Sequence, residues 1–422
     1  MYKYFLALLL ISGLACYKPI IQRLVQRSEV PEPTSNQKLP MGLRGQSCCN
    51  DYSSYAPDTM HLDHSPMKYI RVNVHFMNSA DSTNNFDEEA GVTYALGLLK
   101  AANYDIETND KLFLPYGNDL PNLPPQYRYV LTPRENDPGD DGIYFHYDDE
   151  LYYYIVRGRD RNRHKTEVIK KYGVQLDTVL NIFLMPHHPD STASPTYKAS
   201  QCGIALGDAV KVAGGWESGP DFWQVRMVLN HEVGHIYGLS HTWAYNDGCD
   251  DTPRNPQCWN RTDEPPCDTA ASNNLMDYNA YQRAWSPCQI GKIHYTMSNL
   301  NSKSRRYLVP NWCTLHEDKH IFIQDSVHWQ SMKDLEGNLT IQRGGILQIS
   351  CRVAIPPGGK ITVQPGGKLI LDNCLLHNSC GEMWDGIEIQ EQGKYKGEVV
   401  FVGEPVIQDV IWPELVPVSE PN

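Results

Sequence analysis

The most informative eleven residues of this chain are His231-Glu232-Val233-Gly234-His235-Ile236-Tyr237-Gly238-Leu239-Ser240-His241. On a helix, His231 and His235 lie one turn apart on the same face, so their imidazoles can hold a single zinc ion. Glu232 follows the first of them, and its carboxylate can take the proton of a metal-bound water. Gly238 lets the chain leave the helix with a positive φ, after which His241 can return as a third ligand. Three protein ligands with an open fourth position predict a catalytic zinc site, because structural zinc sites are closed by four ligands.

This pattern is the extended zinc signature of the metzincins, and two segments after it narrow the resemblance. Cys249-Asp250-Asp251-Thr252-Pro253 and Asn274-Leu275-Met276-Asp277-Tyr278 resemble motifs of the pappalysin family, the second of them its Met-turn. The resemblance is dense from residue 225 to residue 297 and faint upstream. It implies that Met276 forms a packed floor beneath the zinc. It also implies that Tyr278 projects toward the metal, where its phenol can donate to the oxyanion of the tetrahedral intermediate.

The resemblance implies an α+β catalytic domain at residues 66–300, with a mixed twisted sheet, the active-site helix and a helical C-terminal subdomain. The hydrophobic periodicity of single segments agrees with this expectation. It predicts strands at 69–76, 127–131 and 178–184, helices at 86–104, 166–172 and 287–300, and an active-site helix that opens at 221–229. The rest of 105–150 is expected to form loops. Residues 202–212 resemble the edge strand along which metzincins lay an extended substrate, which would pair with it as an added strand.

Three histidines outside the signature are weighed as ligands and set aside. His75 alternates with apolar neighbours, which favours a place within a strand. His187 and His188 invite a metal interpretation, but the zinc site already has three ligands. The aromatic run 144–154 either packs in the core or lines a cleft wall, and core packing is the expectation.

The composition and the N-terminus indicate an exported protein of two domains. The chain has 422 residues, 41% of them hydrophobic, and its net charge of −13 argues against nucleic acid and anionic membrane surfaces as partners. Lys3 and the apolar run 4–14 predict a signal peptide at 1–15, too short to span a membrane. Cys16 resembles the lipidated cysteine of a bacterial lipoprotein, and ordinary cleavage after Ala15 is the alternative. The protein is therefore expected to be secreted or attached to the surface of a bacterial cell.

Twelve cysteines in an exported chain predict disulfides rather than free thiols. No two of them have Cys-x-x-Cys spacing, so a second zinc held by thiolates is not expected. For the four cysteines between the zinc signature and the end of the catalytic domain, the sequence alone allows three pairings. By resemblance, Cys249 would pair with Cys267, and Cys258 with Cys288.

Acidic residues in the same region suggest a second metal. Asp250, Asp251 and Asp263 lie in a loop-like stretch that runs to about residue 273. Together with backbone carbonyls, such hard oxygen ligands can bind a structural calcium ion, as pappalysin-like enzymes often do here. The alternative is a solvated acidic loop.

Residues 16–65 mix Pro, Ser, Gln and Asn with charges and lack a sustained period. They are expected to form a tether or pro-segment with little regular structure. A thiolate from Cys48 or Cys49 can occupy the open zinc position and keep a protease latent until the segment is removed, as in some metzincins. The alternative, which we favour, is a disulfide that involves one of the two.

The character of the sequence changes after a linker at 301–320. Residues 344–349, 358–363 and 366–371 repeat a Gly-Gly-x-β-x-β theme, and 386–389 follow a related pattern. The first and third repeats are 22 residues apart, close to one coil of a parallel β-solenoid. An all-β, solenoid-like domain is therefore expected at 321–422, with a small β-sandwich as the rival. No cap is evident after the last repeat, so the domain is expected to be incomplete and to expose sticky strand edges.

These observations predict an exported zinc endopeptidase that binds a protein or peptide substrate as an extended strand. Glu232 would act as the general base, and Tyr278 would assist the oxyanion. The alternative is a surface-anchored binding or adhesion protein, in which the solenoid carries the main role and proteolysis is narrow or absent. The complete set of three histidines, Glu232, Met276 and Tyr278 argues against a degenerate site.

Overall fold

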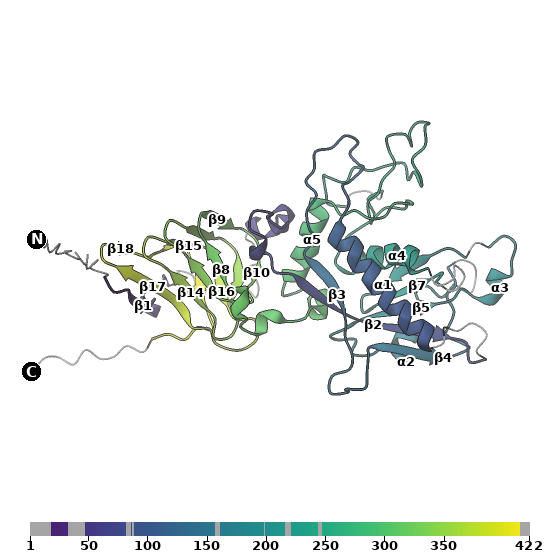
Figure 1. Ribbon diagram of the computed structural model, residues 1–422, viewed down its shortest axis with the longest axis horizontal. Helices are drawn as coiled ribbons and strands as arrows, with labels where there is room; N and C mark the ends of the chain where they lie inside the picture. Colours follow the sequence, from purple (N-terminus) through teal and green to yellow (C-terminus); the bar gives the residue numbers. More distant parts are fainter. Residues whose placement is uncertain are drawn as a thin grey trace, which may run out of the picture.

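The computed structural model describes residues 18–32, 47–81, 86, 88–156, 161–197, 199–215, 221–243 and 247–413. An α+β part holds the elements between residues 68 and 298, and an all-β part begins at residue 321. The two parts lie side by side along the long axis of the molecule (Figure 1). Among these residues, no helix has the length and apolar character needed to cross a bilayer. The signal peptide predicted at 1–15 and the lipid site predicted at Cys16 lie outside the described residues.

A six-stranded sheet forms the middle of the α+β part. Its strands are β2 (Lys68–Asn78), β3 (Tyr127–Leu131), β4 (Ile143–Tyr147), β5 (Leu180–Met185), β6 (Cys202–Ala205) and β7 (Ala209–Ala213), in the order β3-β2-β5-β7-β6. The long β2 pairs with β3 along its first half and with β4 along its second. Every pair is parallel except that of β6 with β7, and β6 is the edge strand. The strands predicted at 69–76, 127–131 and 178–184 are confirmed. Residues 202–212, expected to form one edge strand, form two: β6 at the edge and β7 between β5 and β6.

The strand β4 corrects the expectation that 143–147 form a loop. Its side chains are aromatic on both faces, so the sequence shows no polar–apolar alternation. On one face Phe145 stacks on Phe76, with ring centroids 5.1 Å apart, and on the other His146 packs on Tyr172 at 4.3 Å. Of the aromatic run 144–154, the structure buries Tyr144, Tyr152 and Tyr154, as core packing predicts, and exposes Tyr147.

Helices cover both faces of the sheet, because alternate strand residues point to opposite sides. α1 (Glu88–Thr108) and α4 (Phe222–Ile236) pack on one face and α2 (Glu167–Tyr172) on the other (Figure 1). α3 (Pro189–Thr192) is one short turn, and α5 (Pro287–Ser298) begins with a capping box between Ser286 and Gln289. The predicted helices are confirmed. The larger core joins Val72, Ile182 and Val210 of the strands to Leu98 and Leu229 of the helices.

The strands after residue 320 wind into a parallel β-solenoid with three faces. The first face holds β8 (Ile321–Ile323), β11 (Leu339–Ile341), β14 (Lys360–Val363) and β17 (Gly386–Gln392), with β18 (Tyr395–Lys396) as a hairpin partner of β17. The second holds β9 (Ser326–Trp329), β12 (Ile346–Ile349), β15 (Lys368–Asp372) and β19 (Glu398–Val402). The third holds β10 (Lys333–Asp334), β13 (Arg352–Ala354), β16 (Leu375–His377) and β20 (Val406–Ile407).

The register explains the repeats in the sequence. The first and third repeats stack on the second face, where Ile346 lies beside Lys368. The second and fourth stack on the first face, where Lys360 lies beside Gly386. Pairing along all three faces is parallel, which is the arrangement of a solenoid and not of a β-sandwich.

The described residues before β2 hold little regular structure, as expected, but they pack on the rest of the chain. β1 (Ile21–Leu24) pairs antiparallel with β17 on the side that faces away from β14. Val25 and Val30 then enter the solenoid core. These residues cap the last coil at β17, which does not present the open edge expected there, whereas β19 and β20 are the end strands of their sheets among the described residues. The sequence alone does not predict this cap, because its residues lie far along the chain from the coil that they cover.

Residues 47–65 lie at the junction of the two parts. The 3-10 helices η2 (Ser47–Asn50), η3 (Tyr52–Tyr55) and η4 (Leu62–His64) make up most of this segment. Tyr52 and Tyr55 both contact the ring of Tyr295 on α5, with centroids 5.2 and 5.3 Å away. Cys49 forms a disulfide with Cys351 of the solenoid. The segment is therefore held by both parts.

A buried charge network joins the α+β part to the solenoid. Arg305, in η5 (Lys303–Tyr307), donates to the Asp334 carboxylate at 2.6 Å, and Arg352 donates to it at 2.8 Å. Arg352 also donates to the carbonyl of Ser298 at the end of α5. The linker 301–320 continues through η6 (Asn311–Cys313) and η7 (Glu317–Lys319). The disulfide Cys313–Cys380 ties it to the solenoid.

Candidate metal centre

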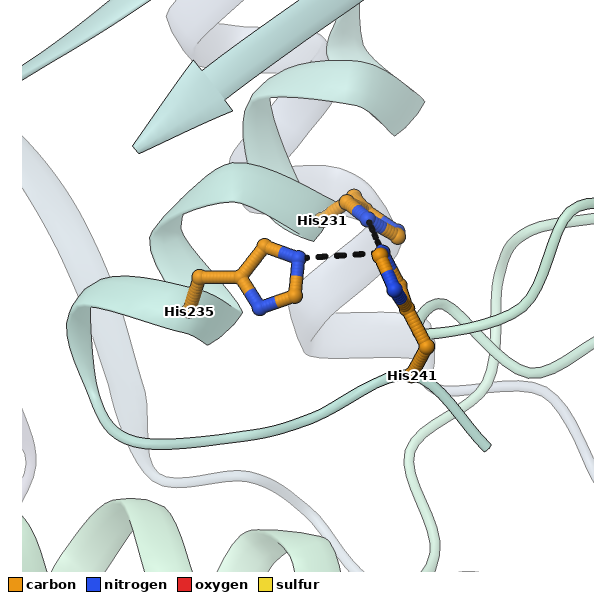
Figure 2. Close-up of side chains that lie close together, drawn as sticks. All are labelled: His231, His235 and His241. Carbon is orange, nitrogen blue, oxygen red and sulfur yellow. Dashed lines mark hydrogen bonds between the residues drawn. The ribbon is translucent and has the colours of Figure 1, made fainter. Parts of the chain in front are cut away.

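Local sequence features bring His231, His235 and His241 together. Asp221 caps the start of α4 by accepting a hydrogen bond from the N–H of Trp223, and the helix continues to Ile236. Gly238 then adopts a φ of +87°, as predicted, and the N–H of Leu239 bonds to the carbonyl of Gly234. This turn reverses the chain, so that His241 faces the two helical histidines (Figure 2).

The three imidazoles converge through their Nε2 atoms. The Nε2 of His241 lies 3.1 Å from that of His231 and 3.2 Å from that of His235. The Nδ1 atoms of His231 and His235 lie 2.6 and 2.9 Å from the carbonyls of Leu275 and Leu239. A carbonyl only accepts, so each Nδ1 carries the proton and each Nε2 presents its lone pair to the centre.

The electrostatics of the histidines fit a metal ion. Burial lowers the pKa of His231 to about 3 and that of His241 to about 4, and it also lowers the pKa of His235. Neutral imidazoles whose lone pairs face one another repel unless a cation lies between them. Neutral nitrogen ligands with carbonyl-bound Nδ1 groups are what Zn²⁺ takes in proteins. The residues present therefore fit zinc.

The turn at residues 274–278 packs against α4 and His231. Met276 is fully buried, and a Cβ added at Gly234 of α4 would lie 2.6 Å from its sulfur. The amide of Asn274 bonds with that of Gln289 on α5 through both oxygen and nitrogen, at 2.7 and 3.0 Å. The carbonyl of Leu275 is thereby set against His231. Met276 is thus packed, and its role as a floor beneath the zinc stays a prediction.

Two aromatic residues border the centre on the side of His241. Tyr278 is 48% exposed, and its ring centroid lies 5.0 Å from that of His241 and 5.9 Å from that of His231. Burial, and then the charge of Glu232, raise the pKa of its phenol above the ordinary value. Trp243 stacks on His241 with centroids 4.8 Å apart. Tyr278 therefore keeps its proton near the site, where it can donate a hydrogen bond.

Glu232 is 7% exposed, on the α4 face that packs against β6. Burial raises its pKa to about 7, against the opposing effect of the Ala205 N–H, which donates to the carboxylate. A carboxyl group with a pKa near neutrality can both take and return a proton. The contact with Ala205 cannot be predicted from the sequence, because it depends on how closely the helix approaches the edge strand.

Gln282 is a residue of the site that the sequence did not single out. Its Nε2 donates to the carbonyls of Leu275 at 3.1 Å and Asp277 at 2.6 Å, and lies 3.3 Å from Nδ1 of His231. It supports the turn that holds this histidine. Its only signal in the sequence is that a polar residue stands four positions after Tyr278. Nothing in the sequence shows that this residue is buried.

The disulfides of this region correct the pairing implied by the resemblance. Cys249 bonds to Cys288, and Cys258 bonds to Cys267. Cys288 lies in the first turn of α5, where its N–H donates to the carboxylate of Asp251 at 2.9 Å. This contact brings the helix start to Cys249 and leaves Cys258 and Cys267 to close their own loop.

The cysteine considered for latency is also placed. Cys49 bonds to Cys351, so it offers no thiolate in this structure, and the disulfide alternative is confirmed for this residue. The side chain of Cys48 lies outside the described residues. Cys49 thus serves the junction of the two parts.

The three aspartates predicted to bind calcium do not gather. Asp250 and Asp263 are exposed, and Asp251 is engaged with Cys288. Among the residues that the structure describes, they do not form a cluster of three ligands. The anchor of this loop is instead Asp247, which accepts hydrogen bonds from the N–H of Cys249 and the hydroxyl of Thr252.

The histidines that were set aside as ligands have structural partners. His75 lies within β2, with Nε2 2.9 Å from Oδ1 of Asn181 and Nδ1 2.9 Å from His146. His187 contacts the Ser200 carbonyl at 3.0 Å, and His188 accepts from the Asp190 N–H at the start of α3.

Comparison with known proteins gives matches among solved structures alone. No protein-family model matches the chain. No curated protein matches it either. Mature mirolysin of Tannerella forsythia in complex with a cleaved peptide is 17% identical, over 58% of this chain and 96% of that one, with a TM-score of 0.40. Mirolysin in complex with compound 9 is 17% identical over the same shares, with a TM-score of 0.39. A mutant of Tannerella forsythia promirolysin is 16% identical over 58% of this chain and 86% of that one, with a TM-score of 0.40.

Proposed function

We propose that this chain is a zinc-dependent endopeptidase of pappalysin-like metzincin type. The observation that carries the proposal is the convergence of the Nε2 atoms of three neutral imidazoles. The buried carboxyl group of Glu232 lies on the helix that bears two of these histidines. Zinc held by His231, His235 and His241 supplies a Lewis acid that polarises a peptide carbonyl and acidifies water.

The residues of the chain supply the proton transfers. Glu232 takes the proton of the attacking water and returns it to the nitrogen of the leaving amine. A pKa near 7 lets it perform both steps at neutral pH. Tyr278 remains protonated and donates its hydroxyl proton to the developing oxyanion.

The edge strand β6 offers a place for the substrate. The N–H of Leu206, the residue that follows β6, bonds to the Ala209 carbonyl, so the N–H and C=O of Gly203 and the C=O of Ala205 point away from β7. The N–H of Ala205 points the same way but donates to Glu232. An extended polypeptide pairs with such a free edge as an added strand. The substrate is therefore a protein or peptide in extended conformation.

An oxidising compartment agrees with the disulfides. The described residues contain Cys49–Cys351, Cys249–Cys288, Cys258–Cys267 and Cys313–Cys380. Disulfides of this kind persist outside the cytosol. Export, to the medium or to the cell surface, is part of the proposal, and calcium at the acidic loop stays a prediction.

The test compares wild type with Glu232→Gln and His241→Gln, using zinc content and casein cleavage. Glu232→Gln is expected to keep one zinc per chain and lose about 10²–10⁴-fold in rate. His241→Gln is expected to lose both zinc and activity. Chelation of the wild type should abolish cleavage, and added zinc should restore it. Cleavage by Glu232→Gln at the wild-type rate would sink the assignment, and zinc without cleavage in the wild type would favour the binding-protein alternative.

A further inference from the structure

The backbone of β6 touches the side chain of Glu232. A Cβ added at Gly203 would lie 2.6 Å from Cγ and 3.0 Å from Oε1 of Glu232. Heavy atoms in proteins do not approach a Cβ so closely. The Glu232 side chain can therefore occupy its position only because residue 203 is a glycine, which has no Cβ. Two residues further on, the N–H of Ala205 donates to the Glu232 carboxylate.

The two contacts come from the same side of the strand. Gly203 and Ala205 are two positions apart, so their Cα positions face α4 together, and their peptide groups point to the free edge. The Glu232 side chain thus contacts the backbone of β6 at Gly203 and accepts a hydrogen bond from it at Ala205. Glu232 has a flexible side chain, and these two contacts restrain it.

We propose that β6 positions the general base, with Gly203 as a positioning residue that makes room for Glu232 and the Ala205 N–H as its anchor. The inference rests on the proposed function and deepens it. It gives the edge strand a second task besides pairing with substrate. Gly203 acts only through Glu232 and touches neither metal nor substrate in this role.

A purely structural role for Gly203 is the competing explanation. The same added Cβ would lie 2.8 Å from Cγ1 of Val228, one turn before Glu232 on α4. Gly203 could therefore serve merely to let α4 approach the sheet. The two explanations differ in which of the two side chains must be removed to relieve a Gly203→Ala substitution.

The experiment measures kcat and KM on a fluorogenic peptide, zinc content and thermal stability for Gly203→Ala, Val228→Ala and the double variant. Gly203→Ala is expected to lose about 10²-fold in kcat, because a misplacement of about 1 Å is enough for such a loss. KM and zinc content should stay near wild type, since the ligands and the strand edge remain. The double variant should regain stability but not kcat, because Glu232 still meets the new Cβ.

Gly91→Ala is the matched control. Its Cβ would clash with the ring of Phe145 on β4 at 2.4 Å, and neither residue belongs to α4 or β6, so it should lower stability and spare kcat. Crystal structures of wild type and Gly203→Ala give a readout independent of activity: the Glu232 carboxylate should bond to Ala205 N–H in the first and be displaced in the second.

Wild-type kcat in Gly203→Ala, recovery of kcat in the double variant, or an undisplaced Glu232 would each overturn the inference. The proposed function fails differently, through the absence of chelator-sensitive cleavage by the wild type. In that case the crystal structures alone decide whether β6 positions Glu232.

Discussion

Met276 and Tyr278 are two residues apart in one turn, yet their side chains differ in exposure to solvent. Met276 is fully buried against Gly234 of α4, whereas Tyr278 is half-exposed beside His241. The carbonyl of Asn274 accepts from the N–H of Asp277 and from the side chain of Asn279, which keeps the turn tight. The turn therefore delivers one side chain to the core and the next but one to solvent.

Tyr278→Phe should lower kcat by about 10²-fold, the typical effect of removing one oxyanion donor, with KM and zinc content unchanged. The ring remains to contact His241, so the loss reports the hydroxyl alone. Steady-state kinetics on a fluorogenic peptide make the measurement. Tyr281→Phe, on a residue that is 37% exposed three positions away, is the control and should match wild type. A wild-type kcat in Tyr278→Phe would remove its hydroxyl from the mechanism.

Among the elements, the segments before β2 have the greatest consequence for the chain. β1 caps the solenoid and η3 packs on α5, so both ends of the segment belong to folded parts. A pro-segment that must be released has weaker attachments than a disulfide to Cys351. The described contacts favour a permanent structural role for residues 47–65.

Replacing both Cys49 and Cys351 by Ser should lower the free energy of unfolding by about 2–5 kcal/mol, because the disulfide closes a long loop of the unfolded chain. Proteolytic activity at 25 °C should not rise, since Cys49 is not a latency thiol. Urea unfolding and casein cleavage measure the two quantities. Cys374→Ala, at a buried cysteine outside any disulfide, should leave activity equally unchanged. Increased activity in the double variant alone would restore Cys49 as a switch.

For the whole molecule, the junction around Asp334 links stability to pH. Burial would raise the pKa of Asp334, but the guanidinium groups of Arg352 and Arg305 outweigh it and hold the pKa below its ordinary value. A carboxyl group with a depressed folded-state pKa contributes stability above its unfolded pKa of about 3.9. This stability is lost as the pH falls below that value toward the folded-state pKa.

Asp334→Asn should destabilise the protein by about 3–5 kcal/mol at pH 7, because two buried cations lose their partner. The difference from wild type should shrink as the pH falls from 5 toward 2. Urea unfolding at several pH values measures it. Asp318→Asn, whose side chain is 76% exposed, is the control and should show little effect at any pH. A difference that stays constant with pH would exclude the proposed linkage.

The sequence by itself determined the features that depend on near neighbours. The spacing of His231, His235 and His241, with Gly238 between them, defines a ligand set because a helix and one turn have known geometry. Alternation predicted β2, a nearly continuous apolar run predicted β5, and the 22-residue repeat predicted the stacking of Ile346 beside Lys368. Alternation did not predict β4, because aromatic side chains on both faces of that strand conceal the period.

Only the tertiary structure decided which distant segments meet. The partners of Cys49 and Cys288, the cap formed by β1, and the fit of Glu232 against Gly203 all join residues far apart in the chain. Such contacts follow from the packing of whole faces, which buries apolar area without leaving a local pattern in the sequence. The chemistry of the metal centre can therefore be predicted from eleven residues. The position of the Glu232 carboxylate depends on the edge strand β6, and no sequence pattern links this strand to residues 231–241.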